Sequence, residues 1–309
     1  MLDLKAKYEA GKVESSEEQW KAATIEEIGI LKYNVLSGID STTGKVLTVE
    51  NLNEQKDAIL LDLYRLEHNI PVMSANAHNY RTVFDSMAIS FSSMFLAILM
   101  IMIAGTSISN EVSKGTIKFW LITPNKRWKI LLAKIVAAVC LLLVMTLAIS
   151  LISELIGSIA LSDNPAQDYL YVENGEVKAI NHTVYMILYN LVQDIDILVF
   201  MLFAFMLSTV TRSSAMSIGL SIGTYIGNGL IMALINQFLK YDFVKFIPFN
   251  NLGLVDKVFP NSVSYLTMQI ASSMTANTSL GFSLAVLGVC ALLMIITMFD
   301  SFVKRDIRS

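Results

Sequence analysis

The chain has 309 residues, of which 54% are hydrophobic and only 16% are charged, and its formal net charge is −3. With a mean hydropathy of +0.56 it is far too apolar for an ordinary soluble domain, so the composition indicates a membrane protein. The few positive charges form no extended basic surface, which argues against a nucleic-acid partner. Residues 1–85 hold 9 Lys and Arg against 14 Asp and Glu, whereas residues 86–309 hold 14 against 12, so most of the acid lies at the front.

Two helices are expected before the first membrane span. Ser15 with Glu18 forms a possible capping box, and Asn51 with Glu54 forms another, each ahead of a helical pattern. The turn-rich stretch 38–45 links them, which favours an antiparallel helical hairpin. This hairpin is either a spacer packed on the membrane face or on a second copy, or a domain that collects a ligand.

Five segments are long and apolar enough to cross a bilayer as helices, which takes roughly 20 residues. They are 86–108, 130–153, 191–210, 215–237 and 279–300. The expected fold class is therefore all-α, a polytopic membrane protein with about five transmembrane helices in residues 86–309 and a helical hairpin in front. The two cysteines, Cys140 and Cys290, lie inside these spans without metal-ligand spacing to any histidine, so no metal site is predicted, although a disulfide stays open.

The distribution of Lys and Arg orients the spans, because these residues accumulate on the cytoplasmic side. Nine of them lie in 109–129, in 211–214 and after residue 300, whereas the connections 154–190 and 238–278 together hold four. This bias predicts a multi-pass protein of the plasma membrane with a cytoplasmic C-terminus. The same topology makes residues 1–85 extracytoplasmic.

With an odd number of spans and a cytoplasmic C-terminus, the N-terminal segment must cross the membrane, and this crossing needs an explanation. Nothing before residue 86 resembles a signal peptide, since charges are spread through the first twenty residues. Either the helix at 86–108 carries its flank outward, or a first membrane helix precedes Met1 in the natural gene. The second explanation is favoured, and it predicts a further apolar span encoded upstream.

No segment of the chain is equipped to hydrolyse ATP or a peptide bond. The stretch 38–46 comes closest to a P-loop, but its glycines are one residue too far apart and Val46 replaces the required hydroxyl. Asp194 and Asp196 are two positions apart on a helix and point about 200° apart, so they cannot share a proton as an aspartyl pair does. Each is either an interfacial acid or part of a polar pathway, and Glu154 has the same alternatives. No catalytic residue is predicted.

A stripe of small residues runs along the fourth span. Gly219, Gly223 and Gly227 recur every four residues, which lets another helix approach closely. The partner is either a second subunit or another helix of the same chain.

The segment 109–129 alternates charged with aromatic and apolar residues, which suits an interfacial helix over 111–122. Pro124 interrupts it, and the basic residues of 126–129 would anchor the next span. Taken alone, these features are also typical of an ordinary cytoplasmic anchor.

The order of residues around this segment is more specific. It runs Glu111, Lys114-Gly115-Thr116, Leu121-Ile122-Thr123-Pro124, Arg127, Lys129-Ile130-Leu131-Leu132 and Lys134. This order resembles the E…GT…LLxxPxxRxxxLLxK signature of permease subunits of type 2 ABC transporters. The ending 302–307 is similar to that family's ending, and 63–71 resembles the large loop that some bacterial members carry between their first two membrane helices.

The resemblance implies a six-helix permease that pairs with an identical or a second permease and binds two cytoplasmic ATPase subunits. These partners would hold ATP and Mg, and the permease itself would need no cofactor. The five spans would correspond to helices two through six, 255–277 to re-entrant external helices, and the glycine stripe to the dimer seam. Residues 111–122 would form the coupling helix, with the contact made by Glu111, Lys114, Gly115, Thr116, Phe119, Pro124 and Arg127.

The expected function is therefore that of a bacterial ABC exporter subunit driven by a separate ATPase. A passive scaffold or a sensor, whose external hairpin binds a ligand, is the alternative from another class. An intramembrane enzyme is the third alternative, and the sequence does not identify a substrate.

Overall fold

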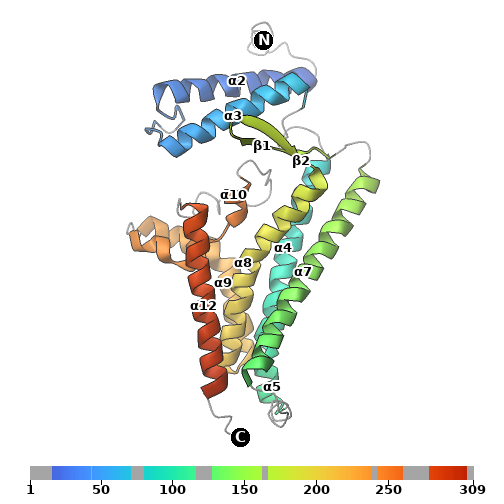
Figure 1. The fold of residues 1–309 in the computed structure, drawn as a ribbon, viewed down its shortest axis with the longest axis vertical. Coiled ribbons are helices and arrows are strands. Elements are labelled where there is room, and N and C mark those ends of the chain that lie inside the picture. Colours follow the sequence, from blue (N-terminus) through green and yellow to red (C-terminus); the bar gives the residue numbers. More distant parts are fainter. Residues whose placement is uncertain are drawn as a thin grey trace. The chain divides into compact units, whose positions relative to one another are not determined.

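The computed structural model of the chain describes residues 16–42, 44–70, 80–115, 127–161, 166–238, 242–259 and 278–304. The chain divides into two compact units, whose elements are shown in Figure 1. The first unit comprises Met1–Val83 with Asp163–Tyr185, and the second comprises Phe84–Ser162 with Met186–Ser309. The first unit thus takes in a stretch from the connection between the second and third spans.

Two helices build the first unit. α2 (Ser16–Ser37) packs against α3 (Val49–His68), as Figure 1 shows in blue, and the unit buries Ala22 and Leu61 almost completely. The helical pair expected in front of the spans is therefore confirmed.

The ends of α3 differ from the expected ones. Its N-cap is Thr48, whose hydroxyl accepts a hydrogen bond from the Asn51 backbone N–H at 3.3 Å. The prediction that Asn51 begins this helix is wrong, because Thr48 supplies a capping oxygen one turn earlier. The helix ends at Asn69, which adopts the left-handed conformation with φ 55°. Ser15, the expected cap of the first helix, lies outside the described residues.

A two-stranded antiparallel sheet completes the first unit, where the sequence analysis expects only a loop. β1 (Tyr169–Glu173) pairs with β2 (Glu176–Ile180) across an Asn174-Gly175 turn in which both residues have positive φ, 55° and 81°. Two positive φ values are characteristic of the type I′ hairpin turn. Both strands contact α3. The N-terminal helices and part of the connection after the second span therefore pack together in one unit.

A buried carboxyl makes the stability of the first unit depend on pH. Asp62 of α3 is 5% exposed, and burial together with the negative charge of Glu27 raises its pKa to about 6. Because the folded carboxyl keeps its proton above the pH at which the unfolded one loses it, stability falls as the pH rises from the ordinary pKa of 3.8 to about 6.

Asp62→Asn is therefore expected to stabilise the first unit above pH 6 by about 2 kcal/mol, and to have little effect at pH 4. Hydrogen exchange of the α3 amides in the full-length protein measures this gain at both pH values. Asp57→Asn, which changes an exposed acid of the same helix, is the matched control. Equal protection of wild type and Asp62→Asn at pH 7.5 would contradict the prediction.

The second unit holds five helices long and apolar enough to span a membrane, as predicted. They are α4 (Tyr80–Ser107), α7 (Arg127–Ala160), α8 (His182–Thr211), α9 (Ser214–Phe238) and α12 (Leu280–Lys304). α8 begins well before the apolar stretch expected from residue 191, because hydropathy marks the lipid-embedded part of a helix and not its end. Its first residue lies in the first unit, so α8 runs from one unit into the other.

α8 contributes most to the core of the second unit. Half of its most apolar stretch is buried inside the chain, a larger share than in any other span found in the described residues. Phe205 and Met201 of α8 are buried together with Met100 of α4, Leu142 of α7 and Met298 of α12. Large apolar side chains on α7, α9 and α12 remain exposed, as lipid-facing helices require.

Three short helical elements are described in the connection between α9 and the last span. η1 (Asp242–Phe246), η2 (Pro248–Asn251) and α10 (Leu254–Val258) follow each other there, and buried asparagines bond to the carbonyls that such turns leave open. Asn251 Nδ2 donates to the carbonyls of Lys245 and Ile247 at 2.7 and 3.0 Å. The re-entrant helices expected over 255–277 are described only as far as residue 259.

Candidate functional site

One end of the helical bundle carries the residues singled out by the permease signature. This end, called the basic end below, is formed by α5 (Ser109–Ser113), the start of α7, the junction between α8 and α9, and the end of α12 (Figure 1). Ile108 separates α4 from α5, but its backbone stays in the right-handed helical region (φ −101°, ψ −44°), so the two form one nearly continuous helical stretch that ends at Ser113.

An ion pair ties α5 to α7 at the basic end. Lys134 Nζ donates to Glu111 Oε1 at 2.6 Å and to the carbonyl oxygen of Ser107 at 3.0 Å. Both charged side chains are about one-fifth exposed, so the pair is partly shielded from solvent. Glu111 and Lys134 are the first and last residues of the signature, and the fold brings them into contact across 23 positions of sequence.

Hydroxyl groups tie the same turn to two further helices. The backbone N–H of Ser109, which is fully buried, donates to Ser208 Oγ of α8 at 3.1 Å. Its hydroxyl lies 2.7 Å from that of Ser214 at the start of α9, and Ser214 Oγ donates to Asn110 Oδ1 at 2.8 Å. The sequence analysis missed these serines, although they cluster beside the expected cytoplasmic ends of the spans.

The helix expected over 111–122 is interrupted. α5 ends at Ser113, Lys114 is exposed, and Gly115 has a φ of +70°, a conformation that L side chains rarely adopt. Thr116, Phe119 and Pro124 lie outside the described residues, and of Arg127 only its helical backbone is described.

The glycine stripe of α9 faces away from the rest of the described chain. A Cβ atom added at Gly219 or Gly223 would meet no atom within 4 Å, and one at Gly227 would meet only Ile231 of the same helix. The opposite face packs inward through Ser217 and Ser221, both fully buried. The stripe is not used for packing among the described residues.

The two aspartates of α8 bond to different elements, in line with their expected separation around the helix. Asp194 Oδ1 accepts a hydrogen bond from Thr146 Oγ1 of α7 at 2.9 Å. Asp196 Oδ2 accepts one from the Gly253 backbone N–H at 2.9 Å. The two carboxylates therefore do not form a pair.

Glu154 of α7 lies opposite an acid of α4. One carboxylate oxygen of Glu154 and one of Asp85 lie within 4.8 Å of each other.

A lysine network lies at the end of the bundle remote from the basic end. Lys257 Nζ donates to Thr278 Oγ1 at 2.8 Å and to Ser283 Oγ at 2.5 Å, and both hydroxyls donate to Asn251 Oδ1. Burial lowers the pKa of Lys257, although the negative charge of Asp196 acts in the opposite direction. The network attaches α10 to the start of α12, and the sequence analysis did not single it out.

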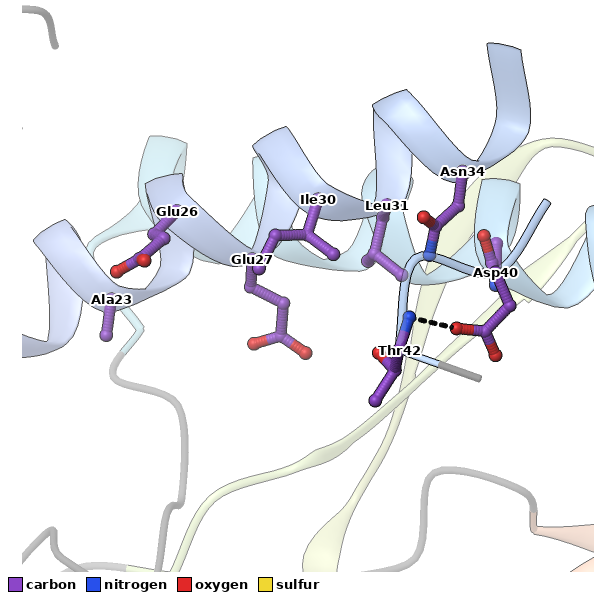
Figure 2. Close-up of a pocket in the computed structure, with 9 residues that line it drawn as sticks. Ala23, Glu26, Glu27, Ile30, Leu31, Asn34, Asp40 and Thr42 are labelled. Carbon is purple, nitrogen blue, oxygen red and sulfur yellow. Dashed lines mark hydrogen bonds between the residues drawn. The ribbon is translucent and has the colours of Figure 1, made fainter. Parts of the chain in front are cut away.

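The first unit has an acidic pocket of about 360 Å³ (Figure 2). Figure 2 shows Glu26 and Glu27 of α2 on one side and Asp40 and Thr42 of the link on the other, with the Thr42 N–H donating to Asp40 Oδ1 at 2.7 Å. The lining residues are Ala23, Glu26, Glu27, Ile30, Leu31, Asn34, Asp40, Thr42 and Gln55. The pocket combines negative charge with an apolar wall.

Comparison with known proteins identifies relatives without a known activity. Residues 65–308 match the model of a family described as "Protein of unknown function (DUF2705)". The chain is also 28% identical over 256 residues to the "Uncharacterized protein YhcI" of Bacillus subtilis (strain 168). This alignment covers 82% of the chain and 76% of the relative. Neither description states a function.

Proposed function

The chain belongs to the DUF2705 family, and we propose that it is the membrane-spanning permease subunit of an ATP-driven ABC exporter. The observation that carries the proposal is the contact between Glu111 and Lys134, which joins the two ends of the permease signature at the basic end. A plain membrane anchor does not require that these two residues meet. ATP and Mg would bind to separate ATPase subunits, so the chain itself is no enzyme.

The contacts at the basic end suggest how the ATPase would act on the spans. α5 is attached to α7 through Lys134, to α8 through Ser208 and to α9 through Ser214. A displacement of the 109–129 segment would therefore be transmitted to three spans together. Coupling needs only that the closed ATPase binds one arrangement of these spans more tightly than the other.

The proposal places the basic end in the cytoplasm of the cell. Its Lys and Arg residues would then follow the positive-inside rule, and the ATPase partner would be a cytoplasmic protein. The first unit, including residues 1–85, would then be extracytoplasmic, and the C-terminus would be cytoplasmic. The open stripe on α9 would face a second permease chain, identical or related.

Purification of the full-length chain from its native membranes tests the proposal. We expect an ATPase subunit with a P-loop to co-purify in stoichiometric amount and to hydrolyse ATP faster in the complex than alone. If no nucleotide-binding subunit accompanies the chain in mild detergent or in nanodiscs, the proposed function is wrong.

Gly115 offers a specific variant for this experiment. Gly115→Val is expected to reduce the co-purified ATPase about tenfold, because a β-branched residue at φ +70° must change the path of the segment. Gly115→Asn is the matched control, since asparagine tolerates the left-handed conformation, and it should retain the partner. If both variants retain the ATPase subunit, Gly115 does not contribute to the coupling site.

The acidic pocket favours a second function, a sensor or scaffold whose external hairpin binds a ligand. Glu26 and Glu27 make no ion pair among the described residues, and a cationic ligand with a short apolar group would suit the lining. The same purification separates the two functions, because a sensor does not need an ATPase subunit.

A further inference from the structure

A buried carboxyl group of α8 has an oxygen without a partner. Asp194 is 5% exposed, and its Oδ1 accepts the hydrogen bond from Thr146. Its Oδ2 is also buried and has no hydrogen-bond partner among the residues that the structure describes. A single hydrogen bond from one hydroxyl stabilises a full negative charge only weakly.

The position of Asp194 along the helices puts it at membrane depth. It lies about 26 Å before the end of α8 at the basic end, at 1.5 Å per residue. Its partner Thr146 lies about 27 Å beyond Trp128 of α7 by the same measure. The hydrocarbon layer is about 30 Å thick, so this carboxyl is just inside the layer's far boundary.

The elements around Asp194 supply no compensating cation. One turn away, Asn190 Nδ2 of α8 donates to Ser150 Oγ of α7 at 3.2 Å, which continues a polar seam between the two helices. The ionisable groups nearest in sequence on α7 and α8 are the acids Glu154 and Asp196, which lie beside Asp85 and Gly253 respectively. No Lys, Arg or His of the described chain makes an ion pair with Asp194.

A carboxylate in this position would cost several kcal/mol, because neither water nor a cation balances its charge. The neutral acid avoids this cost, and its carbonyl oxygen still accepts the hydrogen bond from Thr146. Ionisable groups at membrane depth commonly belong to proton or ion pathways.

We propose that Asp194 is a proton-binding site in the seam between α7 and α8, occupied at mildly acidic pH and open to exchange with the solvent. Loss of the proton leaves an anion that a cation or water must neutralise, so the seam separates or takes up a positive group when Asp194 ionises. The site does not depend on the ABC assignment, and it would hold in a sensor or a scaffold as well.

Infrared spectroscopy of the purified full-length protein in nanodiscs tests the site. At pH 5 the wild type should show a carboxylic acid C=O absorption with a component that Asp194→Asn removes, and Asp196→Asn, at a second buried acid, should leave this component in place. In D₂O the band should shift, because an exchangeable proton is replaced by a deuteron. Raising the pH should convert it reversibly into carboxylate absorption.

Thr146→Val gives an independent signature that does not depend on replacing the acid. Removing the hydroxyl frees the Asp194 carbonyl oxygen, so the C=O band should move to higher frequency without losing intensity. Identical spectra of wild type and Asp194→Asn at pH 5 would show that Asp194 is ionised and would overturn the proposal. If the band does not shift in D₂O, the Asp194 proton does not exchange with the solvent, and that part of the proposal is wrong.

Discussion

Reversing the charge of Glu111 is expected to separate ATP hydrolysis from the permease. Glu111→Lys replaces a 2.6 Å ion pair with two ammonium groups in contact, in a place where each side chain is only about one-fifth exposed. The loss of a charged hydrogen bond and the added repulsion are worth about 2 kcal/mol, or at least a tenfold reduction in stimulated ATPase activity. The measurement is the ATPase rate of the purified complex with and without the permease variant.

The exchanged pair is the informative control. Lys134→Glu alone should behave like Glu111→Lys, and the double variant Glu111→Lys with Lys134→Glu should recover most of the activity. Recovery will be incomplete, since a glutamate at position 134 cannot donate to the Ser107 carbonyl as Lys134 does at 3.0 Å. Full stimulation by Glu111→Lys alone would refute the role of this contact in coupling.

Hydropathy predicts the five spans because a bilayer demands about twenty apolar residues in succession. Hydropathy does not predict the hairpin of β1 and β2, since two strands of five residues carry little periodic signal. Its turn sequence Asn174-Gly175 was nevertheless a local signal, being the residue pair that a type I′ turn requires.

The sequence predicts some residues of the basic end but not the contacts between them. The motif identifies Glu111 and Lys134, but their contact depends on how α5 packs beside the first turns of α7. The bonds from Ser109 to Ser208 and Ser214 join residues 99 and 105 positions apart. No local pattern specifies such pairs, because they follow from how the helices pack.

A bulky residue on the open face of α9 is expected to weaken the pairing of two permease chains. Gly223→Leu introduces a side chain where the described chain has no atom within 4 Å of a Cβ, so it should leave the monomer intact. Small residues allow the close approach of membrane helices, and a leucine at the centre of the stripe prevents it. We expect the dissociation constant of the dimer in nanodiscs or mild detergent to rise about tenfold or more.

Leucine variants of two further glycines distinguish the loss of the dimer interface from damage to the monomer. Gly288→Leu on α12 also enters open space, so it adds the same apolar bulk at another exposed position and should leave the dimer unchanged. Gly105→Leu on α4 instead enters a packed position, because its Cβ would lie 2.8 Å from Ile218 Cγ1 of α9. It should lower the thermal stability of the monomer itself. A dimer that survives Gly223→Leu would exclude this face of α9 as the seam, and the second chain would then have to contact another lipid-facing surface.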